Sequence, residues 1–194
     1  MFKRYSPLTH ALTGRDGANG ERRFQFAVAP MGELLLLASH LGKQAAFAQE
    51  LNPLLGNAPT PATHTEQRLT NSLLLQVAPG QHWCLTTDTT LANTLATRRF
   101  SAGSVTSLSH SRVRVVITGS GIPDLLSKGI SVDLDPTQFV VGQFVQTALE
   151  HIGILLHRRG DDQYELYLPA TFARTLWEWL LDAAMADGYH LLAP

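Results

Sequence analysis

Apolar and polar residues alternate along several short stretches of the chain, as they do in half-buried β-strands. In RFQFAVA the residues Phe24, Phe26 and Val28 fall on one face. Similar or continuous apolar runs predict further strands at LLLLAS, SLLLQVA, HWCLTT, SVTSLSH, RVRVVITG, QFVQTALE, IGILLHR and YELYLP. The last two runs are separated by RGDDQ, a loop typical of a β-hairpin.

Four stretches have helical spacing instead. GKQAAFAQELNPLL predicts a helix that ends near Pro53. Asp88 is expected to cap a second helix that runs to about Ala96, since an aspartate side chain can accept from the first free amides of a helix. SGIPDLLSKG predicts a short helix closed by Gly129, and residues 171–184, TFARTLWEWLLDAA, predict the last helix.

Strand pairs separated by single helices predict an α+β fold with antiparallel sheets. Residues 83–95 and 164–176 also align without gaps and share Leu, Thr, Ala, Thr and Leu at equivalent positions. Both segments read as strand, tight turn and helix. The sequence therefore predicts two similar antiparallel α+β halves that are related by a pseudo-twofold axis.

These halves are expected at roughly 22–110 and 111–194 within a single domain, 22–194. Residues 1–21 contain Pro7 and three glycines and are expected to form an N-terminal arm. An ordered arm needs a surface to lie against. Its apolar residues are candidate contacts to a partner chain: Phe2, Tyr5 and Leu8.

The two tryptophans of the last helix, Trp177 and Trp179, lie about 200° apart around its axis. The apolar arc of this helix is therefore wider than the stripe of an ordinary surface helix. We expect Trp179 to pack on the chain's own sheet and Trp177 with Leu181 to face a second layer. That layer is either the other half of the chain or a partner chain, since tryptophan is a common interface anchor.

Composition excludes several classes of function. The 194 residues are 44% hydrophobic and carry a formal net charge of −1, and no basic stripe indicates nucleic-acid binding. The N-terminus lacks the apolar run of a signal peptide, and the longest apolar run is far too short to span a membrane. The single cysteine, Cys84, suits a reducing compartment. We therefore expect a soluble cytoplasmic protein.

The chain carries few signs of its own chemistry. None of the eight histidines belongs to a zinc-binding motif, and ITGSGIP lacks the third glycine of a dinucleotide-binding turn. Cys84 is expected to be a packed thiol, and Asp133 with Asp135 to form a turn before Pro136. No catalytic, cofactor-binding or metal-binding residue is predicted.

The segment from Leu108 to Ala184 resembles the C-terminal part of the gamma subunit of heterotetrameric sarcosine oxidase. The shared landmarks are SHSR, LLSKGISVDL, GQFVQT, ILLHR, YELYLPATFA and LWEWLLDAA. The first hundred residues resemble it only loosely, best at QHWCLTTD. The resemblance implies a fold similar to the folate-binding domain of the glycine-cleavage aminomethyltransferase, which consists of two related α+β halves.

The resemblance also implies a place in a four-chain enzyme. There the alpha and beta chains hold FAD, FMN, NAD and tetrahydrofolate, a delta chain holds zinc, and the gamma chain is a non-catalytic structural subunit. Such complexes oxidatively demethylate sarcosine, or a related N-methyl amino acid, and form hydrogen peroxide. The alpha chain is the expected neighbour of this chain.

A stand-alone folate-binding protein or aminomethyltransferase-like enzyme is the alternative. Those enzymes carry paired aspartates just before the strand that matches ILLHR. Here the corresponding residues are His151, Ile152 and Gly153, without an aspartate. The chain also lacks the K-G-C-x-x-G-Q motif of the related iron–sulfur repair protein. The structural subunit is therefore the favoured interpretation.

Overall fold

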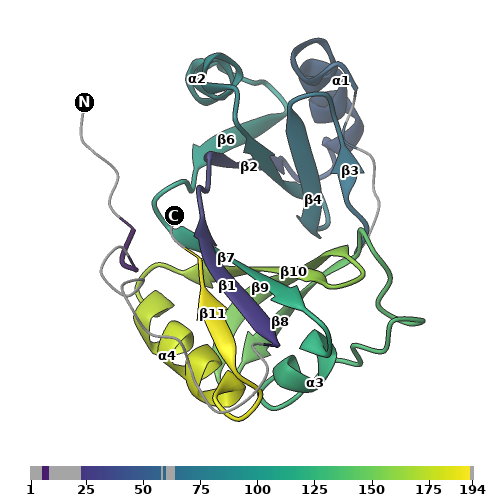
Figure 1. Cartoon of the computed structure of the whole chain (residues 1–194). Coiled ribbons are helices and arrows are strands. Elements are labelled where there is room, and N and C mark those ends of the chain that lie inside the picture. The colour runs from purple at the N-terminus through teal and green to yellow at the C-terminus, as the bar shows by residue number, and fades with distance from the viewer. Residues whose placement is uncertain (1–5, 9–22, 58, 60–63, 193–194) are drawn as a thin grey trace. The chain divides into compact units, whose positions relative to one another are not determined.

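The computed structural model describes residues 6–8, 23–57, 59 and 64–192, drawn as coloured ribbon in Figure 1. The chain divides into two compact units. The first unit comprises Met1–Pro30 and His110–Pro194, and the second comprises Met31–Ser109. The expected halves at 22–110 and 111–194 differ from these units mainly in the first strand, which pairs within the first unit. The single domain 22–194 stays a prediction.

The first unit contains a six-stranded sheet in the order β11-β1-β7-β10-β9-β8. All its ladders are antiparallel except the parallel pairing of β1 with β11. Helices α3 and α4 cover one face of this sheet (Figure 1). The elements in chain order are β1 Phe24–Ala29, β7 Arg112–Gly119, α3 Ile122–Leu126, β8 Phe144–Leu149, β9 Ile152–Gly160, β10 Gln163–Pro169, α4 Ala173–Ala184 and β11 Tyr189–Leu191.

The core of the first unit lies between this sheet face and the two helices. Every second residue of β7 and β10 points into it, as the period of a strand requires. Helix α4 contributes the buried residues Ala173, Leu176, Trp177, Leu180 and Ala184, which recur at helical spacing. The remaining buried members of the cluster come mainly from the strands and from α3.

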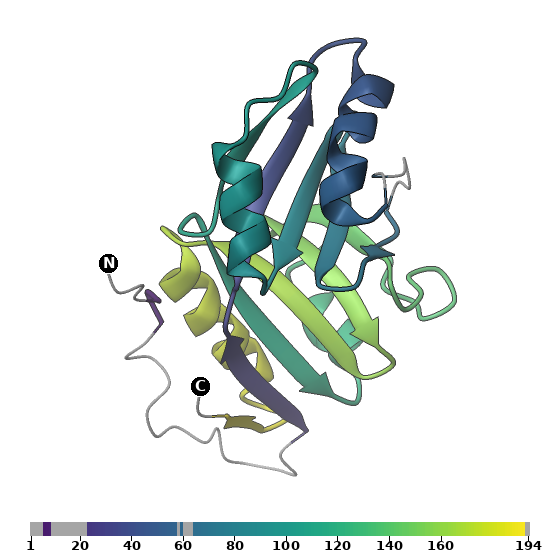
Figure 2. The same ribbon diagram turned by 90° about the horizontal axis from the view of Figure 1, so that it is seen from above.

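The second unit contains a five-stranded antiparallel sheet in the order β3-β4-β5-β2-β6. Helices α1 and α2 cover one face of it, which Figure 2 shows from above. The elements are β2 Glu33–Ser39, α1 Gln44–Leu55, β3 Gln67–Arg68, β4 Ser72–Ala78, β5 Gln81–Thr86, α2 Thr89–Thr97 and β6 Gly103–Ser107. Leu35, Leu37, Phe47, Leu51 and Cys84 belong to its core.

Helix α2 begins as the sequence predicts. One carboxylate oxygen of Asp88 accepts hydrogen bonds from the amides of Thr90 and Leu91, each at 2.9 Å. Helix α1 continues two residues beyond Pro53 and ends at Gly56, whose φ of 75° is left-handed. Pro53 is tolerated inside this last turn, although a proline in the helix interior ordinarily breaks the helix.

Five of the six strands of the first sheet follow the same order as the five strands of the second, and β11 has no counterpart. Hairpin β9–β10 corresponds to β4–β5, and each hairpin is followed by a helix, α4 or α2. In the first sheet β10 is followed by β7 and then by β1. In the second sheet β5 is followed by β2 and then by β6. This agrees with the internal repeat at 83–95 and 164–176. The mixed α+β fold with two sheets predicted from sequence is therefore present, and every described ladder except β1–β11 is antiparallel, as expected.

Candidate functional site

A buried polar cluster lies on the helix-free face of the first unit's sheet. In β10, Tyr164, Leu166 and Leu168 point into the core, so Glu165 and Tyr167 point to the opposite face. Both are at most 2% exposed. The carboxylate of Glu165 accepts from Nη2 of Arg114 at 2.7 Å and from the hydroxyl of Tyr167 at 2.6 Å.

Charges within this polar cluster are balanced by neighbouring strands. Arg114 lies on β7, beside β10, and Arg159 on β9 approaches the same carboxylate at 3.5 Å. Burial, and next the negative charge of Glu165, raises the pKa of Tyr167 well above its usual range. Each oxygen of Glu165 accepts a hydrogen bond, and through Arg114 and Arg159 the cluster joins β10 to β7 and β9.

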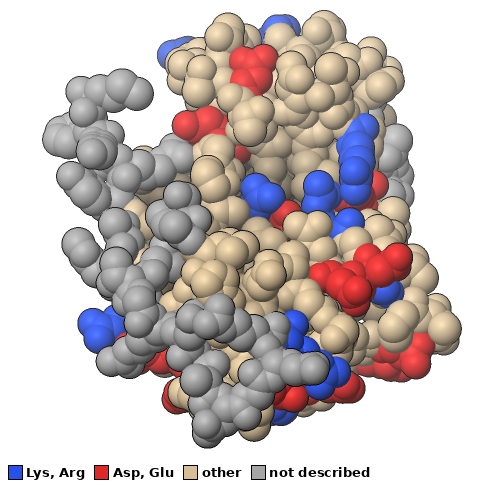
Figure 3. All heavy atoms as spheres, in the orientation of Figure 1, with Lys and Arg blue, Asp and Glu red and all other residues tan. Residues whose placement is uncertain are grey.

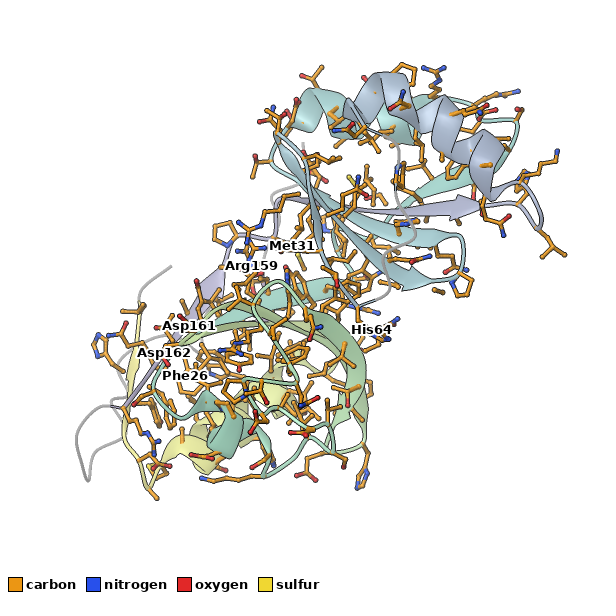
Figure 4. All side chains as sticks on the ribbon, turned by 90° about the vertical axis from the view of Figure 1, so that its right-hand side faces the viewer. Phe26, Met31, His64, Arg159, Asp161 and Asp162 are labelled. Carbon is orange, nitrogen blue, oxygen red and sulfur yellow. The ribbon has the colours of Figure 1, made fainter. Side chains whose placement is uncertain are left out.

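A second buried cation fastens a loop of the same unit. Arg158, 4% exposed, donates from Nη1 to the carbonyls of Phe139 at 2.7 Å and Pro136 at 3.1 Å. The loop also contains the two candidate aspartates. Asp133 accepts from the amide of Asp135 at 2.9 Å, so both form a turn, as the sequence predicts. Asp161 and Asp162, labelled in Figure 4, form the turn between β9 and β10.

Cys84 and the described residues of the types that bind metals show no reactive arrangement. Cys84 is buried, and burial raises the pKa of its thiol to about 11, which leaves it protonated and unreactive at neutral pH. Among the described residues, no group of three or more His, Cys, Asp and Glu side chains could hold a metal ion. On the described part of the face in Figure 3, basic and acidic residues lie in small separate groups.

One cavity of about 310 Å³ lies in the second unit, beside helix α1. Its described lining includes Phe47 and Leu51 together with the polar residues Ser39, Gln76 and His82. A space of this size is at the lower limit for small-molecule sites. The described part of the lining contains no Asp, Glu, Lys or Arg, so these residues supply no charged group for a cofactor phosphate or carboxylate.

The expectation that Trp179 packs on the chain's own sheet while Trp177 faces a second layer is wrong. Trp177 is 1% exposed and belongs to the core, where its ring meets Phe26 edge to face at 6.0 Å between centroids. Trp179 is only partly buried and lies on the flank of α4. A Cβ atom at Gly129 would come within 2.5 Å of its ring, so the glycine permits this close packing. The helix is rotated relative to the expectation because its most tightly packed stripe runs through Leu176, Trp177 and Leu180.

Two of the residues predicted to contact a partner chain are buried in the structure. Leu8 is fully buried in the core of the first unit, so neither it nor Trp177 presents surface to a partner in this conformation. Leu181 is partly buried against the same core. Phe2 and Tyr5 lie outside the described residues. Sequence periodicity could not distinguish these cases, because apolar side chains serve cores and interfaces alike.

None of the described helices is both long and apolar enough to cross a membrane.

Comparison of the sequence with known proteins finds similar chains. Residues 44–186 match the sequence model of the sarcosine oxidase gamma subunit family. The chain is 33% identical over 81 residues to the sarcosine oxidase subunit gamma of Corynebacterium sp. strain P-1, and 32% identical over 81 residues to that of an Arthrobacter species. Each match covers 42% of this chain and only 40% of the relative.

Solved structures extend the likeness to nearly the whole chain. A chain of the heterotetrameric sarcosine oxidase from Corynebacterium sp. U-96, in complex with pyrrole 2-carboxylate, superposes with a TM-score of 0.79 at 25% identity. The superposition covers 95% of both chains. The glycine cleavage system aminomethyltransferase T from Bartonella henselae shares the fold, with a TM-score of 0.63 at 15% identity over 88% of this chain and 48% of that one.

Proposed function

Because this chain belongs to the sarcosine oxidase gamma subunit family, we propose that it is a non-catalytic structural subunit of a heterotetrameric sarcosine oxidase-like complex. The complex would oxidatively demethylate sarcosine or a related N-methyl amino acid. The observation that carries this proposal is the family match over residues 44–186, which spans both units. The similar chain from Corynebacterium sp. U-96, which comes from a heterotetrameric enzyme, supports the same assembly.

The chemistry of the described residues agrees with a structural role. Glu165 is held by Arg114 and Tyr167, Cys84 has a raised thiol pKa, and Asp133 and Asp135 form a turn. Proton transfer or nucleophilic attack needs a side chain that can reach a substrate with its reactive atom available. Glu165, Cys84 and the two aspartates are already engaged in packing or hydrogen bonds.

We propose that the cofactors of the complex lie on its other subunits, with FAD, FMN, NAD and tetrahydrofolate on alpha and beta and zinc on delta. The described residues of this chain do not fit these groups. The lining residues of the cavity beside α1 that the structure describes include no Asp, Glu, Lys or Arg, and the arginines of the polar cluster already face a carboxylate. The gamma chain would then contribute surface and rigidity, with the alpha chain as its main neighbour.

Helix α4 offers a surface for that neighbour. Leu181 retains part of its surface, and Met185, one turn later, is 46% exposed. Leu181→Arg and Met185→Arg should each weaken co-purification with the alpha chain. Thr175→Arg, which introduces the same arginine at an exposed position on the other flank of the helix, serves as the control. Unchanged co-purification of both leucine and methionine variants would contradict this surface.

The activity test compares the chain alone with the chain co-expressed with alpha, beta and delta. We expect the isolated chain to show no flavin absorbance and no peroxide formation from sarcosine, and the assembled complex to show both. The chain should co-elute with the other subunits on size exclusion. Peroxide production by the isolated, flavin-free chain would refute the structural role.

A folate-binding protein is the second candidate, favoured by the shared fold with aminomethyltransferase T. That likeness is one of fold, so the function requires a direct test. Titration of the isolated chain with tetrahydrofolate in a calorimeter should give no saturable heat if the structural role holds. Saturable binding at micromolar concentration would favour the folate-binding candidate instead.

A further inference from the structure

The cavity beside α1 has polar side chains on the sheet that forms its floor. Gln76 on β4 lies directly opposite His82 on β5, and His82 lies opposite Leu37 on β2. Residues directly opposite one another point to the same face of a sheet. Leu37 belongs to the core beneath α1 and α2, so Gln76 and His82 also lie on the helix-covered face.

This polar row borders an apolar one. The next row on the same face consists of Leu74, Cys84 and Leu35, which are opposite one another in the same two ladders and belong to the core. Helix α1 supplies the wall of the cavity through Phe47 and Leu51, which are separated by one helical turn. The cavity therefore begins where the apolar core of the second unit ends.

A glycine shapes one end of the cavity. Gly80, in the turn between β4 and β5, has a φ of 71°. A Cβ atom there would collide with Oγ of Ser39 and lie 3.2 Å from Cγ of Gln44. Glycine therefore lets the turn pack closely against the end of β2 and the start of α1. All three residues line the cavity, so this end also carries a hydroxyl and a carboxamide.

The carboxamide of Gln76 lacks a partner in the buried part of this site. Its Oε1 is inaccessible to solvent and has no hydrogen-bond partner among the described residues. A buried acceptor without a donor destabilises the folded chain, so an arrangement of this kind points to a molecule that supplies the donor. A water molecule can supply a donor, but it gains nothing from the apolar side chains of α1.

The size and charge of the cavity restrict the class of ligand. A dry cavity of about 150 Å³ is large enough for benzene. The volume here is about 310 Å³, which leaves room for a molecule of two fused rings. The described lining residues include no Asp, Glu, Lys or Arg, so they favour a molecule without charge.

We propose that this cavity binds a small uncharged molecule whose apolar body packs on Phe47 and Leu51 and whose N–H or O–H donates to Oε1 of Gln76. All described lining residues belong to the second unit. The site is therefore a property of this chain alone and does not depend on the structural role proposed above. Its specificity rests on one hydrogen bond within an otherwise apolar contact.

The test is a titration of the full-length, ¹⁵N-labelled chain with indole, followed by nuclear magnetic resonance. Indole has two fused rings and one N–H donor. Indene, which has the same ring frame with a CH₂ group in place of the N–H, is the matched probe. We expect saturable shifts at the amides of Ser39, Gln76 and Gly80 with indole. Indene should bind about tenfold more weakly, the usual effect of one buried hydrogen bond.

Two variants assign the binding to this cavity. Gln76→Leu keeps the approximate length of the side chain and removes the acceptor, so indole should bind about tenfold more weakly than to the parent and no better than indene. Ala48→Phe places a ring in the cavity and should abolish binding of both probes, because Ala48 is a lining residue. Ala46→Phe is its control, since Ala46 is exposed on the same helix and is not among the described lining residues. Melting temperatures establish that each variant is folded.

Three results would each overturn the proposal. The first is the absence of saturable shifts with indole up to its solubility limit, which would leave only water in the cavity. The second is equal affinity of the parent for indole and indene. The third is a preference for indole that persists in Gln76→Leu, because the donor of the ligand would then have another acceptor.

Discussion

Truncation of Trp177 distinguishes a core residue from an interface anchor. The side chain is 1% exposed, and its ring packs edge to face on Phe26 in the core of the first unit. An interface anchor replaced by alanine would leave the isolated chain stable. A core tryptophan replaced by alanine leaves a cavity that its neighbours fill only in part. We therefore expect Trp177→Ala to destabilise the isolated chain.

The expected size of the effect follows from this burial. Removal of a fully buried tryptophan side chain costs roughly 3–5 kcal/mol, a large part of the roughly 5–15 kcal/mol that typically separates folded from unfolded protein. At this chain length each kcal/mol lowers Tm by about 2–4 °C, so the melting temperature should fall by roughly 6–20 °C. Nε1 of Trp177 is buried without a hydrogen-bond partner among the described residues. Trp177→Phe, which keeps a ring and removes that N–H, should therefore cost less, about 1–2 kcal/mol.

The assay is urea unfolding followed by far-ultraviolet circular dichroism, which does not depend on tryptophan fluorescence. Phe172→Ala is the matched control, because Phe172 precedes the same helix and is 49% exposed. Its cost should stay within about 0.5 kcal/mol. If Trp177→Ala unfolds within about 1 kcal/mol of the parent yet loses its partner chain, Trp177 is an interface residue and the argument from burial fails.

Three further changes test other parts of the structure. Asp88→Ala should cost about 1 kcal/mol in urea unfolding, because two helix amides lose their acceptor, whereas Thr89→Ala at the exposed first helical position should cost little; equal costs would contradict the cap. Glu165→Gln should lower the free energy of unfolding by about 1–3 kcal/mol. The double variant Arg114→Met/Glu165→Gln should cost less than the sum of the two single variants, and strict additivity would show that the pair does not interact. Burial raises the pKa of Cys84 to about 11, so the folded chain holds this proton more tightly than the unfolded chain, whose thiol titrates near 8.5. The stability that this provides is complete below pH ~8.5 and is lost as pH rises through about 11, so Cys84→Ala should flatten the alkaline decline in unfolding free energy; an equally steep decline in the variant would refute it.

Local patterns determined most of the elements. Alternating apolar residues such as Phe24, Phe26 and Val28 are enough to define a strand, because successive side chains of a strand point to opposite faces of the sheet. Asp88 marked a helix start because its side chain completes a bond within three residues. Strands β3 and β11 were missed, and both are very short, two and three residues. They exist because a neighbouring strand pairs with them, which a local pattern does not record.

The sequence by itself determined the α+β class, the strand–helix repeat and the family resemblance, because these follow from residues close together along the chain. Only the tertiary structure decided that β1 joins the sheet of the C-terminal strands, that Trp177 rather than Trp179 enters the core, and that the hydroxyl of Ser109 accepts from the amide of Leu34. Each of these depends on which distant segments pack together. The apolar arc of α4 admitted either tryptophan, and the competition for buried volume among the assembled elements selected one.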